Sequence, residues 1–121
     1  MSDQSKPQQY RDIIDRLVAE CQSGQCKIAA DRVRQGLWNR NASDRELSDQ
    51  QEINFLLQRM PSEDREILAR MLSEQAQLGI FETLKALEEY AVAPFESGYE
   101  GTPYHDFIGR LGGWQWPGGN Q

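Results

Sequence analysis

The sequence predicts an all-α protein, and three observations lead to that prediction. Apolar side chains recur at intervals of three and four residues through most of the first ninety positions, the spacing of one face of an amphipathic helix. No convincing run of alternating apolar and polar residues indicates a β-strand. The composition then changes, because residues 90–121 hold seven of the eleven aromatic residues and seven of the ten glycines. We therefore expect a compact bundle of four to five helices, with an aromatic, Gly/Pro-rich C-terminal tail packed on it.

The length and the net charge limit the domain organisation and exclude several functions. A chain of 121 residues is long enough for one core. We expect a disordered leader over residues 1–8, a single helical domain over residues 9–117 and a flexible C-terminus over residues 118–121. The formal net charge of -6 argues against nucleic acid as a partner, because such binding depends on basic residues that neutralise phosphates. The same charge argues against docking on an anionic membrane.

The N-terminus and the cysteines indicate a cytoplasmic protein. Residues 1–6 lack the apolar core of a signal peptide, and no apolar run approaches the ~18 residues that cross a bilayer. Cys21 and Cys26 flank a turn at Ser23 and Gly24, where a local disulfide is sterically allowed, but a reduced, partly buried pair fits the cytoplasm better. A zinc site would need two more ligands, and His105 is the only histidine, so we expect no metal and no cofactor.

Two helices are predicted in the first third of the chain. The first ends before Gly24, a natural helix stop, and its apolar stripe consists of Tyr10, Ile13, Ile14, Leu17, Val18 and Cys21. The second runs from about residue 25 to residue 36 and is expected to bury Ile28, Ala29 and Val33, with Leu37 and Trp38 just beyond it. Residues 39–47 are polar, which indicates a loop.

Two further helices follow this loop. Ser48 and Gln51 have the spacing of a capping box, and the helix behind them is expected to bury Ile53, Leu56, Leu57 and Met60 before Pro61 ends it. Ser62 then caps a longer helix, with Glu63 and Asp64 near the positive end of its dipole.

The longer helix carries two apolar sets that do not share a face. At about 100° per residue, Ile67, Leu68, Met71 and Leu72 lie on one side, and Ile80, Phe81, Leu84 and Leu87 lie nearly opposite. Gly79 lies between the two sets. Either the helix kinks at Gly79, or one long helix is buried on alternate sides along its length. We favour the second arrangement, with the core around residues 67–87 and the aromatic tail on one side of it.

The aromatic tail contains one short predicted helix. Thr102 and Pro103 have the N-cap and first-turn signature of a helix start, and Gly112 ends the segment. Its apolar face consists of Tyr104, Phe107, Ile108 and Leu111, and residues 114–117 are expected to be extended. Such a tail either folds back to complete a small core or presents a rigid, adhesive surface to a partner. We favour the first use.

An ordered set of motifs covers most of residues 10–117. It consists of Tyr10-Arg11-Asp12-Ile13-Ile14-Asp15, Asn54-Phe55-Leu56-Leu57, Asp64-Arg65-Glu66-Ile67-Leu68-Ala69-Arg70-Met71, Gly79-Ile80, Thr83-Leu84, Pro94-Phe95, Tyr104-His105-Asp106-Phe107, Arg110, Gly113 and Trp116-Pro117. In this set the chain resembles a family of small, mostly bacterial, uncharacterised helical proteins, classed as a domain of unknown function. The resemblance implies a compact helical fold and no established activity. Members tend to carry His-Asp where this chain has Phe81-Glu82, so any chemical role of that histidine would be absent here.

Most candidate binding residues lie in the tail: Tyr104, His105, Asp106, Arg110 and Trp116. A histidine beside an aspartate, with an arginine one helical turn on, is a pattern that acid–base chemistry or anion binding would use. Neighbouring helix residues point apart, however, so we do not expect a His105–Asp106 dyad. Asp106 and Arg110 have the i, i+4 spacing of a surface ion pair. We favour a structural role, in which this pair fixes the short helix and Trp116 packs over it, and we assign no catalytic residue.

Trp38 is a further candidate because it lies inside a basic stretch. That stretch holds Lys27, Arg32, Arg34, Arg40 and Arg45 against Asp31 and Asp44. Basic residues interleaved with an aromatic residue are typical of nucleic-acid binding, but the patch is short and the rest of the chain would repel phosphate. We favour a solvated helix face, or ion pairs with the protein's own acidic helices. If the patch is functional, an acidic partner protein explains it as well as RNA does.

Together these observations favour a non-enzymatic protein-interaction module over an enzyme. The sequence has no phosphate loop, nucleophile elbow or helical Glu-x-x-His pair. We expect a protein partner, or a homodimer through the faces of residues 10–21 or 53–60. A specific version is an immunity- or antitoxin-like protein that masks a basic partner, which the small size and acidic charge suggest. The alternative is a small-ligand-binding or enzymatic protein that uses the tail cluster around His105.

Overall fold

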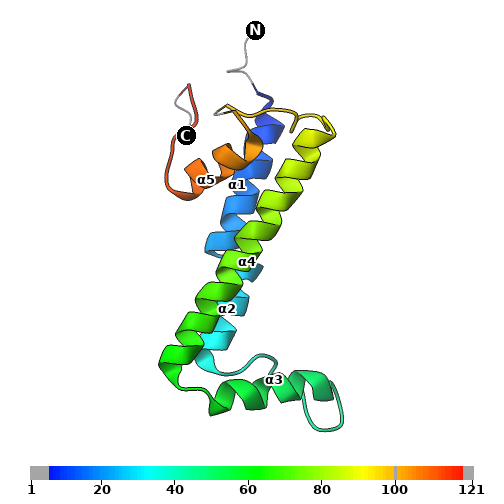
Figure 1. Cartoon of the computed structure of the whole chain (residues 1–121), viewed down its shortest axis with the longest axis vertical. Helices are drawn as coiled ribbons and strands as arrows, with labels where there is room; N and C mark the ends of the chain where they lie inside the picture. The colour runs from blue at the N-terminus through cyan, green and yellow to red at the C-terminus, as the bar shows by residue number, and fades with distance from the viewer. Residues whose placement is uncertain (1–5, 100, 119–121) are drawn as a thin grey trace. The chain divides into compact units, whose positions relative to one another are not determined.

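The computed structural model describes residues 6–99 and 101–118, which form α-helices joined by loops (Figure 1). The helices are α1 (Gln8–Gln22), α2 (Gln25–Gln35), α3 (Ser48–Arg59), α4 (Ser62–Glu89) and α5 (Pro103–Leu111). The described residues contain no strand, only one isolated bridge between Gly98 and Gly101. The all-α prediction is therefore confirmed. Residues 1–5 of the predicted leader and residues 119–121 of the predicted flexible end lie outside the described residues.

The chain divides into two compact units, and each is described by itself. Unit 1 consists of residues 1–20 and 77–121, and unit 2 consists of residues 21–76. α4 contributes its first part to unit 2 and its second part to unit 1, as one helix of 28 residues that continues through Gly79.

The core of unit 2 includes two buried alanines. Its buried residues are Ala30 and Val33 of α2, Leu57 of α3 and Ala69 of α4, with Trp38, Ile53, Met60, Leu68 and Leu72 packed against them. The prediction that Ile28 and Leu56 are buried is wrong, because these side chains are 38% and 45% exposed. Alanine lets helix backbones approach closely, so α2 and α4 turn their Ala30 and Ala69 positions inward instead of their larger neighbours.

α4 leaves exposed some of the apolar side chains that were expected in the core. In unit 2 the helix buries Ala69, while Ile67 and Met71, which were expected in the core, are 49% and 54% exposed. In unit 1 it buries Leu84, as predicted. Leu68, Ala69 and Leu72 mark the inward side of the part of the helix in unit 2, so Ile67 and Met71 lie away from the core of that unit.

The predicted helix ends are correct in part. Gly36 ends α2 in the left-handed conformation, at φ 83°, and its N–H donates to the carbonyls of Arg32 and Val33. The prediction of a capping box that begins at Ser48 is wrong, because the N-cap residue of α3 is Leu47, whose side chain cannot accept a hydrogen bond. The hydroxyl of Ser43 instead accepts hydrogen bonds from the N–H groups of Arg45 and Glu46 in the preceding loop.

In unit 1 the aromatic tail packs on α1. The buried residues of this unit are Tyr10, Ile14 and Val18 of α1, Leu84 of α4, and Phe95, Phe107 and Trp116 of the tail. The prediction that the tail forms part of a core is therefore confirmed. α5 begins as predicted, with Pro103 in its first turn and the Thr102 hydroxyl accepting from the N–H of His105, and it ends at Gly112. Ile108, which was expected on the apolar face of α5, is 38% exposed.

Candidate functional site

Asp106, a candidate from the tail, is a buried carboxylate. It is 0% exposed, and its Oδ2 accepts a hydrogen bond of 2.6 Å from the Tyr10 hydroxyl and one of 2.8 Å from the Tyr99 N–H. The predicted surface ion pair between Asp106 and Arg110 is wrong, because Asp106 points into the core of unit 1. Burial raises the pKa of the Tyr10 phenol above its ordinary value, and the hydrogen bond to Asp106 raises it further. Tyr10 therefore stays a proton donor to this carboxylate.

Arg110 and Trp116 bind α1 through a single carboxylate. Arg110 Nε donates to Asp15 Oδ1 at 2.7 Å, and Trp116 Nε1 donates to Asp15 Oδ2 at 3.0 Å. The Arg110 guanidinium also donates to the Trp114 carbonyl at 2.6 Å and lies 5.2 Å from the Trp116 ring centroid. These hydrogen bonds satisfy the guanidinium group of Arg110, the indole N–H of Trp116 and the carbonyl of Trp114. They therefore fix the tail against α1.

Arg11 supplies a second polar link between α1 and the tail. Its guanidinium donates to the Tyr99 hydroxyl and to the Pro117 carbonyl, both at 3.0 Å. The rings behind it form a continuous cluster, with centroid separations of 5.4 Å for Tyr99–Trp116 and 5.3 Å for Trp114–Trp116. The rings of Tyr99, Trp114 and Trp116 therefore form one cluster, and Tyr99 and Trp116 also contact Tyr10 of α1.

His105 and Tyr104 lie apart from this link. His105 is exposed, and its Nδ1 is 2.8 Å from the Thr102 hydroxyl that caps α5. The Tyr104 ring packs edge-on against Phe81 of α4, with 4.3 Å between centroids. Asp106 is directed elsewhere, toward Tyr10, so the structure does not bring the imidazole and this carboxylate together as an acid–base pair.

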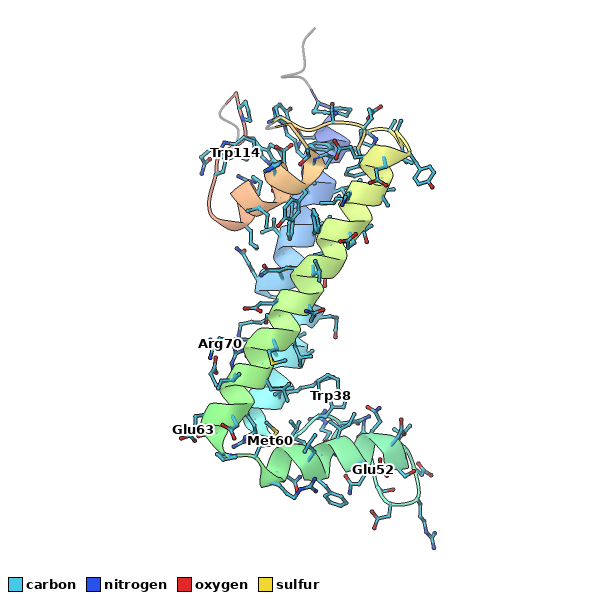
Figure 2. All side chains as sticks on the ribbon, viewed as in Figure 1. Trp38, Glu52, Met60, Glu63, Arg70 and Trp114 are labelled. Atoms are coloured by element: carbon cyan, nitrogen blue, oxygen red, sulfur yellow. The ribbon has the colours of Figure 1, made fainter. Side chains whose placement is uncertain are left out.

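Trp38 lies in the loop between α2 and α3 (Figure 2). A buried amide holds this loop. Asn54 of α3 is 2% exposed, and its Oδ1 accepts from the N–H of Trp38 at 2.7 Å and of Asn39 at 3.0 Å. Its Nδ2 donates to the Asn39 carbonyl and to Gln51 Oε1. A buried amide with every hydrogen-bonding group satisfied fixes the backbone it contacts.

A polar pocket opens beside this segment. Its volume is about 550 Å³, and it is lined by Arg32, Gln35, Leu37, Trp38, Asn39, Arg40 and Asn41. The lining therefore combines two guanidinium groups, three amides, one indole and one aliphatic side chain, with no carboxylate.

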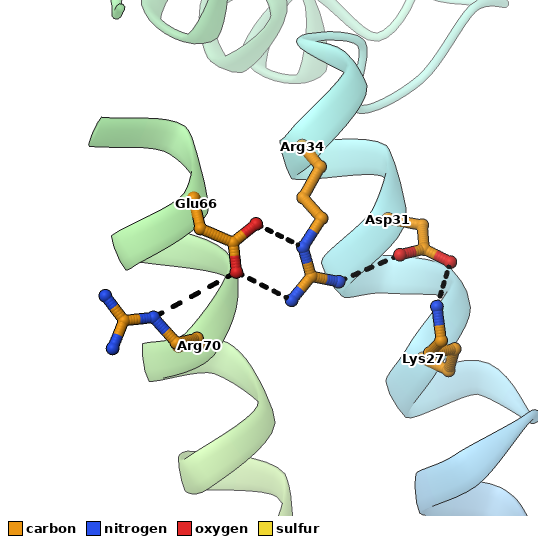
Figure 3. A network of polar contacts seen from close by, with 5 residues as sticks. All are labelled: Lys27, Asp31, Arg34, Glu66 and Arg70. Atoms are coloured by element: carbon orange, nitrogen blue, oxygen red, sulfur yellow. Dashed lines mark hydrogen bonds and ion pairs between the residues drawn. The ribbon is translucent and has the colours of Figure 1, made fainter. Parts of the chain in front are cut away.

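Two other basic residues of this stretch, Lys27 and Arg34, are neutralised by carboxylates (Figure 3). Lys27 and Arg34 both bind Asp31, at 2.7 and 2.8 Å, and Arg34 also binds Glu66 of α4 at 2.8 Å. The hydrogen bond from Lys27 holds the pKa of Asp31 below its ordinary value, and the hydrogen bond from Arg34 does the same for the pKa of Glu66. Part of the basic stretch therefore pairs with an acidic helix, as expected.

A second hollow, an apolar groove, lies at the junction of α3 and α4. It has a volume of about 310 Å³ and is lined by Met60, Asp64, Ile67, Leu68 and Met71. Leu56 of α3 is also exposed, but it is not one of the residues that line the groove. Asp64 is the one charged residue in the lining of this groove.

Sequence reasoning missed this groove and the role of Asn54. The groove was missed because Ile67 and Met71 were assigned to the core. Asn54 carries a signal that is visible in the sequence, a lone polar residue in the apolar run from Ile53 to Leu57. A polar residue on the buried face of a helix is expected to bind backbone groups of a neighbouring segment.

Comparison with known proteins gives a family and no activity. Residues 3–118 match a family of unknown function, DUF6547, and the chain belongs to that family. No curated protein and no solved structure is detectably similar to the chain. Over the described residues, no helix has the length and apolar character to cross a membrane. The same residues hold no group of three or more side chains arranged to bind a metal.

Proposed function

We propose that this protein is a non-enzymatic interaction module that binds a partner protein through the groove between Met60 and Met71. The observation that carries the proposal is the exposure of apolar side chains there, with Met71 54% and Ile67 49% exposed around a shallow hollow. Exposed apolar surface around a hollow is typical of protein-binding sites. Methionine suits such a surface, because its flexible thioether adapts to different apolar shapes.

The chemistry of the groove supports an apolar segment with a nearby basic residue as the bound element. Ile67 and Met71 are one helical turn apart, so they would receive apolar side chains that are themselves spaced by one turn. Asp64 is a charged residue in the lining, and a lysine or arginine of the partner would pair with it. An immunity- or antitoxin-like role, in which the protein masks a basic partner, is one form of this proposal.

A homodimer through α1 has little support. Tyr10 and Ile14 are 0% exposed and lie in the core of unit 1, so this face is already covered. The face of residues 53–60 has more support, since Leu56 is 45% exposed and Met60 lines the groove. We also propose a cytoplasmic location, which the low cysteine content of the chain, two residues in 121, supports.

The proposal is tested by affinity capture of the tagged protein from its native host, followed by mass spectrometry. The wild type is compared with Met71→Lys, which places a charge in the groove while keeping helix propensity nearly unchanged. Leu47→Lys is the matched control, because Leu47 has a similar exposure, 52%, outside the groove.

We expect a stoichiometric partner with the wild type and with Leu47→Lys, and loss of that partner with Met71→Lys. Light scattering on the eluates distinguishes a second copy of the chain from a different protein. Equal recovery of every partner with the two lysine variants would contradict the proposal, as would recovery of the bare monomer from the wild type.

A further inference from the structure

The pocket beside Trp38 has a lining that suits an anion. Arg32, in the last turn of α2, and Arg40, in the following loop, each contribute a guanidinium group to it. Within the part of the chain that the structure describes, neither side chain has an ion-pair partner, whereas the neighbouring Arg34 has two. Unpaired arginines that share a pocket are typical of phosphate and carboxylate recognition, because guanidinium donates two parallel hydrogen bonds.

The neutral part of the lining suits a flat organic group. Trp38 and Leu37 provide an aromatic and an aliphatic surface, and Gln35, Asn39 and Asn41 provide amides that can donate or accept. A volume of about 550 Å³ falls in the range of small-ligand pockets, which is ~300–1,000 Å³. Bare phosphate or sulfate would leave most of this space and the indole unused.

The loop that forms the pocket is fixed before any ligand arrives. Asn54 holds the backbone of Trp38 and Asn39, and Asn39 Oδ1 accepts from the Asn41 N–H at 2.9 Å. Gly36 turns the chain out of α2 in the left-handed conformation. A preformed loop lowers the entropy cost of binding, so this arrangement favours recognition of a small molecule.

The charge of the chain favours a small anion over a polymer. Residues 21–76 carry eight basic and nine acidic residues, and the remaining residues carry five basic and ten acidic ones. A nucleic acid would extend beyond the pocket and meet this acidic surplus. The pocket also lies at the negative end of the α2 dipole, so an anion there depends on both guanidinium groups.

We propose that the pocket lined by Arg32, Trp38 and Arg40 binds a small phosphorylated molecule with an aromatic ring, of the mononucleotide class. Arg32 and Arg40 bind the phosphoryl oxygens, and the indole of Trp38 packs against the ring. This site is separate in its lining residues from the groove between Met60 and Met71.

Calorimetric titration of the full chain with AMP, adenosine and inorganic phosphate tests the proposal. We expect AMP to bind with a dissociation constant below about 1 mM, and the two fragments to bind at least about tenfold more weakly. Arg32→Gln and Arg40→Gln should each weaken AMP binding about tenfold or more, because each removes at least one charge-assisted hydrogen bond to the phosphoryl group. Trp38→Phe should weaken it by a smaller factor, because a smaller ring remains.

Arg59→Gln is the matched control, since Arg59 is an exposed arginine in the last turn of α3 and lies outside the pocket. It should change AMP binding less than about twofold. Met71→Lys should also leave AMP binding unchanged, which separates this proposal from the one for the groove. Circular dichroism melts confirm that each variant is folded.

Four results would overturn the proposal. The first is no heat with AMP at millimolar concentration, and the second is equal weakening by Arg59→Gln, which would indicate a diffuse charge effect. The third is phosphate binding as tight as AMP binding, which would remove the role of Trp38. The fourth is a single-stranded oligonucleotide that binds far more tightly than AMP and is weakened by Arg59→Gln.

Discussion

Tyr10 and Asp106 are 96 positions apart in the sequence and share a hydrogen bond of 2.6 Å between phenol and carboxylate. Both residues are 0% exposed. A buried carboxylate is stable only when its oxygens are satisfied, so this bond makes the tail dependent on α1. The candidate residue Asp106 therefore acts within the core of unit 1.

We expect Tyr10→Phe to lower the free energy of unfolding by about 1–3 kcal/mol, because it removes one donor from a buried acceptor and keeps the ring. Urea denaturation followed by circular dichroism measures this change. Tyr90→Phe is the control, since Tyr90 is 81% exposed and its replacement should change the stability by less than about 0.5 kcal/mol. Equal stabilities of the two variants would show that the bond to Asp106 is not formed.

The raised pKa of Tyr10 predicts a specific loss of stability in alkali. Below pH about 10, the phenol is protonated in both the folded and the unfolded chain, so its contribution is complete. Above that pH the unfolded chain loses the proton and the folded chain keeps it, so the free energy of unfolding falls by up to about 1.4 kcal/mol per pH unit. The stability difference between wild type and Tyr10→Phe should therefore shrink between pH 9 and pH 11. A difference that stays constant over this range would contradict the burial of this phenol.

Trp116 tests whether the tail is part of the core. Its indole is 4% exposed, so Trp116→Ala should cost about 3–5 kcal/mol, whereas Trp116→Phe should cost less because an aromatic ring remains. Chemical denaturation of both variants gives the comparison. Native stability of Trp116→Ala would mean that the tail does not pack on α1 as described.

His105 is expected to contribute little to stability. His105→Ala removes an exposed ring and keeps the backbone N–H that the Thr102 hydroxyl accepts from, so the cost should be below about 1 kcal/mol. Thr102→Ala removes the cap itself and should cost about 1 kcal/mol, or up to 2. Thermal melts compare the two. If Thr102→Ala left the stability unchanged while His105→Ala unfolded the chain, Thr102 would not be the side chain that caps α5.

Two glycines should respond in opposite directions to alanine. Gly79→Ala lies inside α4, where a methyl group meets no other atom, and it should stabilise the chain by about 0.5–1 kcal/mol. Gly36→Ala should destabilise it by more than about 1 kcal/mol, because φ is +83° and the new methyl group would overlap the Arg65 guanidinium. In an Arg65→Ala background the loss at Gly36 should be smaller, which a double-mutant cycle measures. A loss that Arg65→Ala leaves unchanged would remove the proposed overlap.

The helices and the helix ends marked by Thr102, Gly36 and Gly112 could be predicted from the sequence, because periodicity and capping are local properties. The inward faces could not be predicted fully. Periodicity predicts that the largest apolar residues, such as Ile67 and Met71, face the core. In unit 2, close helix packing places Ala69 there instead. Which residue faces inward depends on the size of the side chains on the neighbouring helices, and the sequence of one helix alone does not contain that information.

The candidate site shows the same limit for polar residues. The spacing of Asp106 and Arg110 predicts a local ion pair, but Asp106 bonds to Tyr10 and Arg110 bonds to Asp15. Both true partners lie on α1, about 95 residues away. Helical spacing describes neighbours along one element, so it cannot anticipate a partner that only the tertiary fold supplies.

Hydroxyl-radical footprinting of the protein, free and in the complex captured from its host, tests the central claim most directly. In the free protein, Ile67 and Met71 should be oxidised readily, and Phe107 and Trp116 should be protected by burial. In the complex we predict protection of Ile67 and Met71, with no change at Leu47 or Tyr90. Oxidation of Met71 at the same rate in both samples would contradict a protein-binding role for the groove.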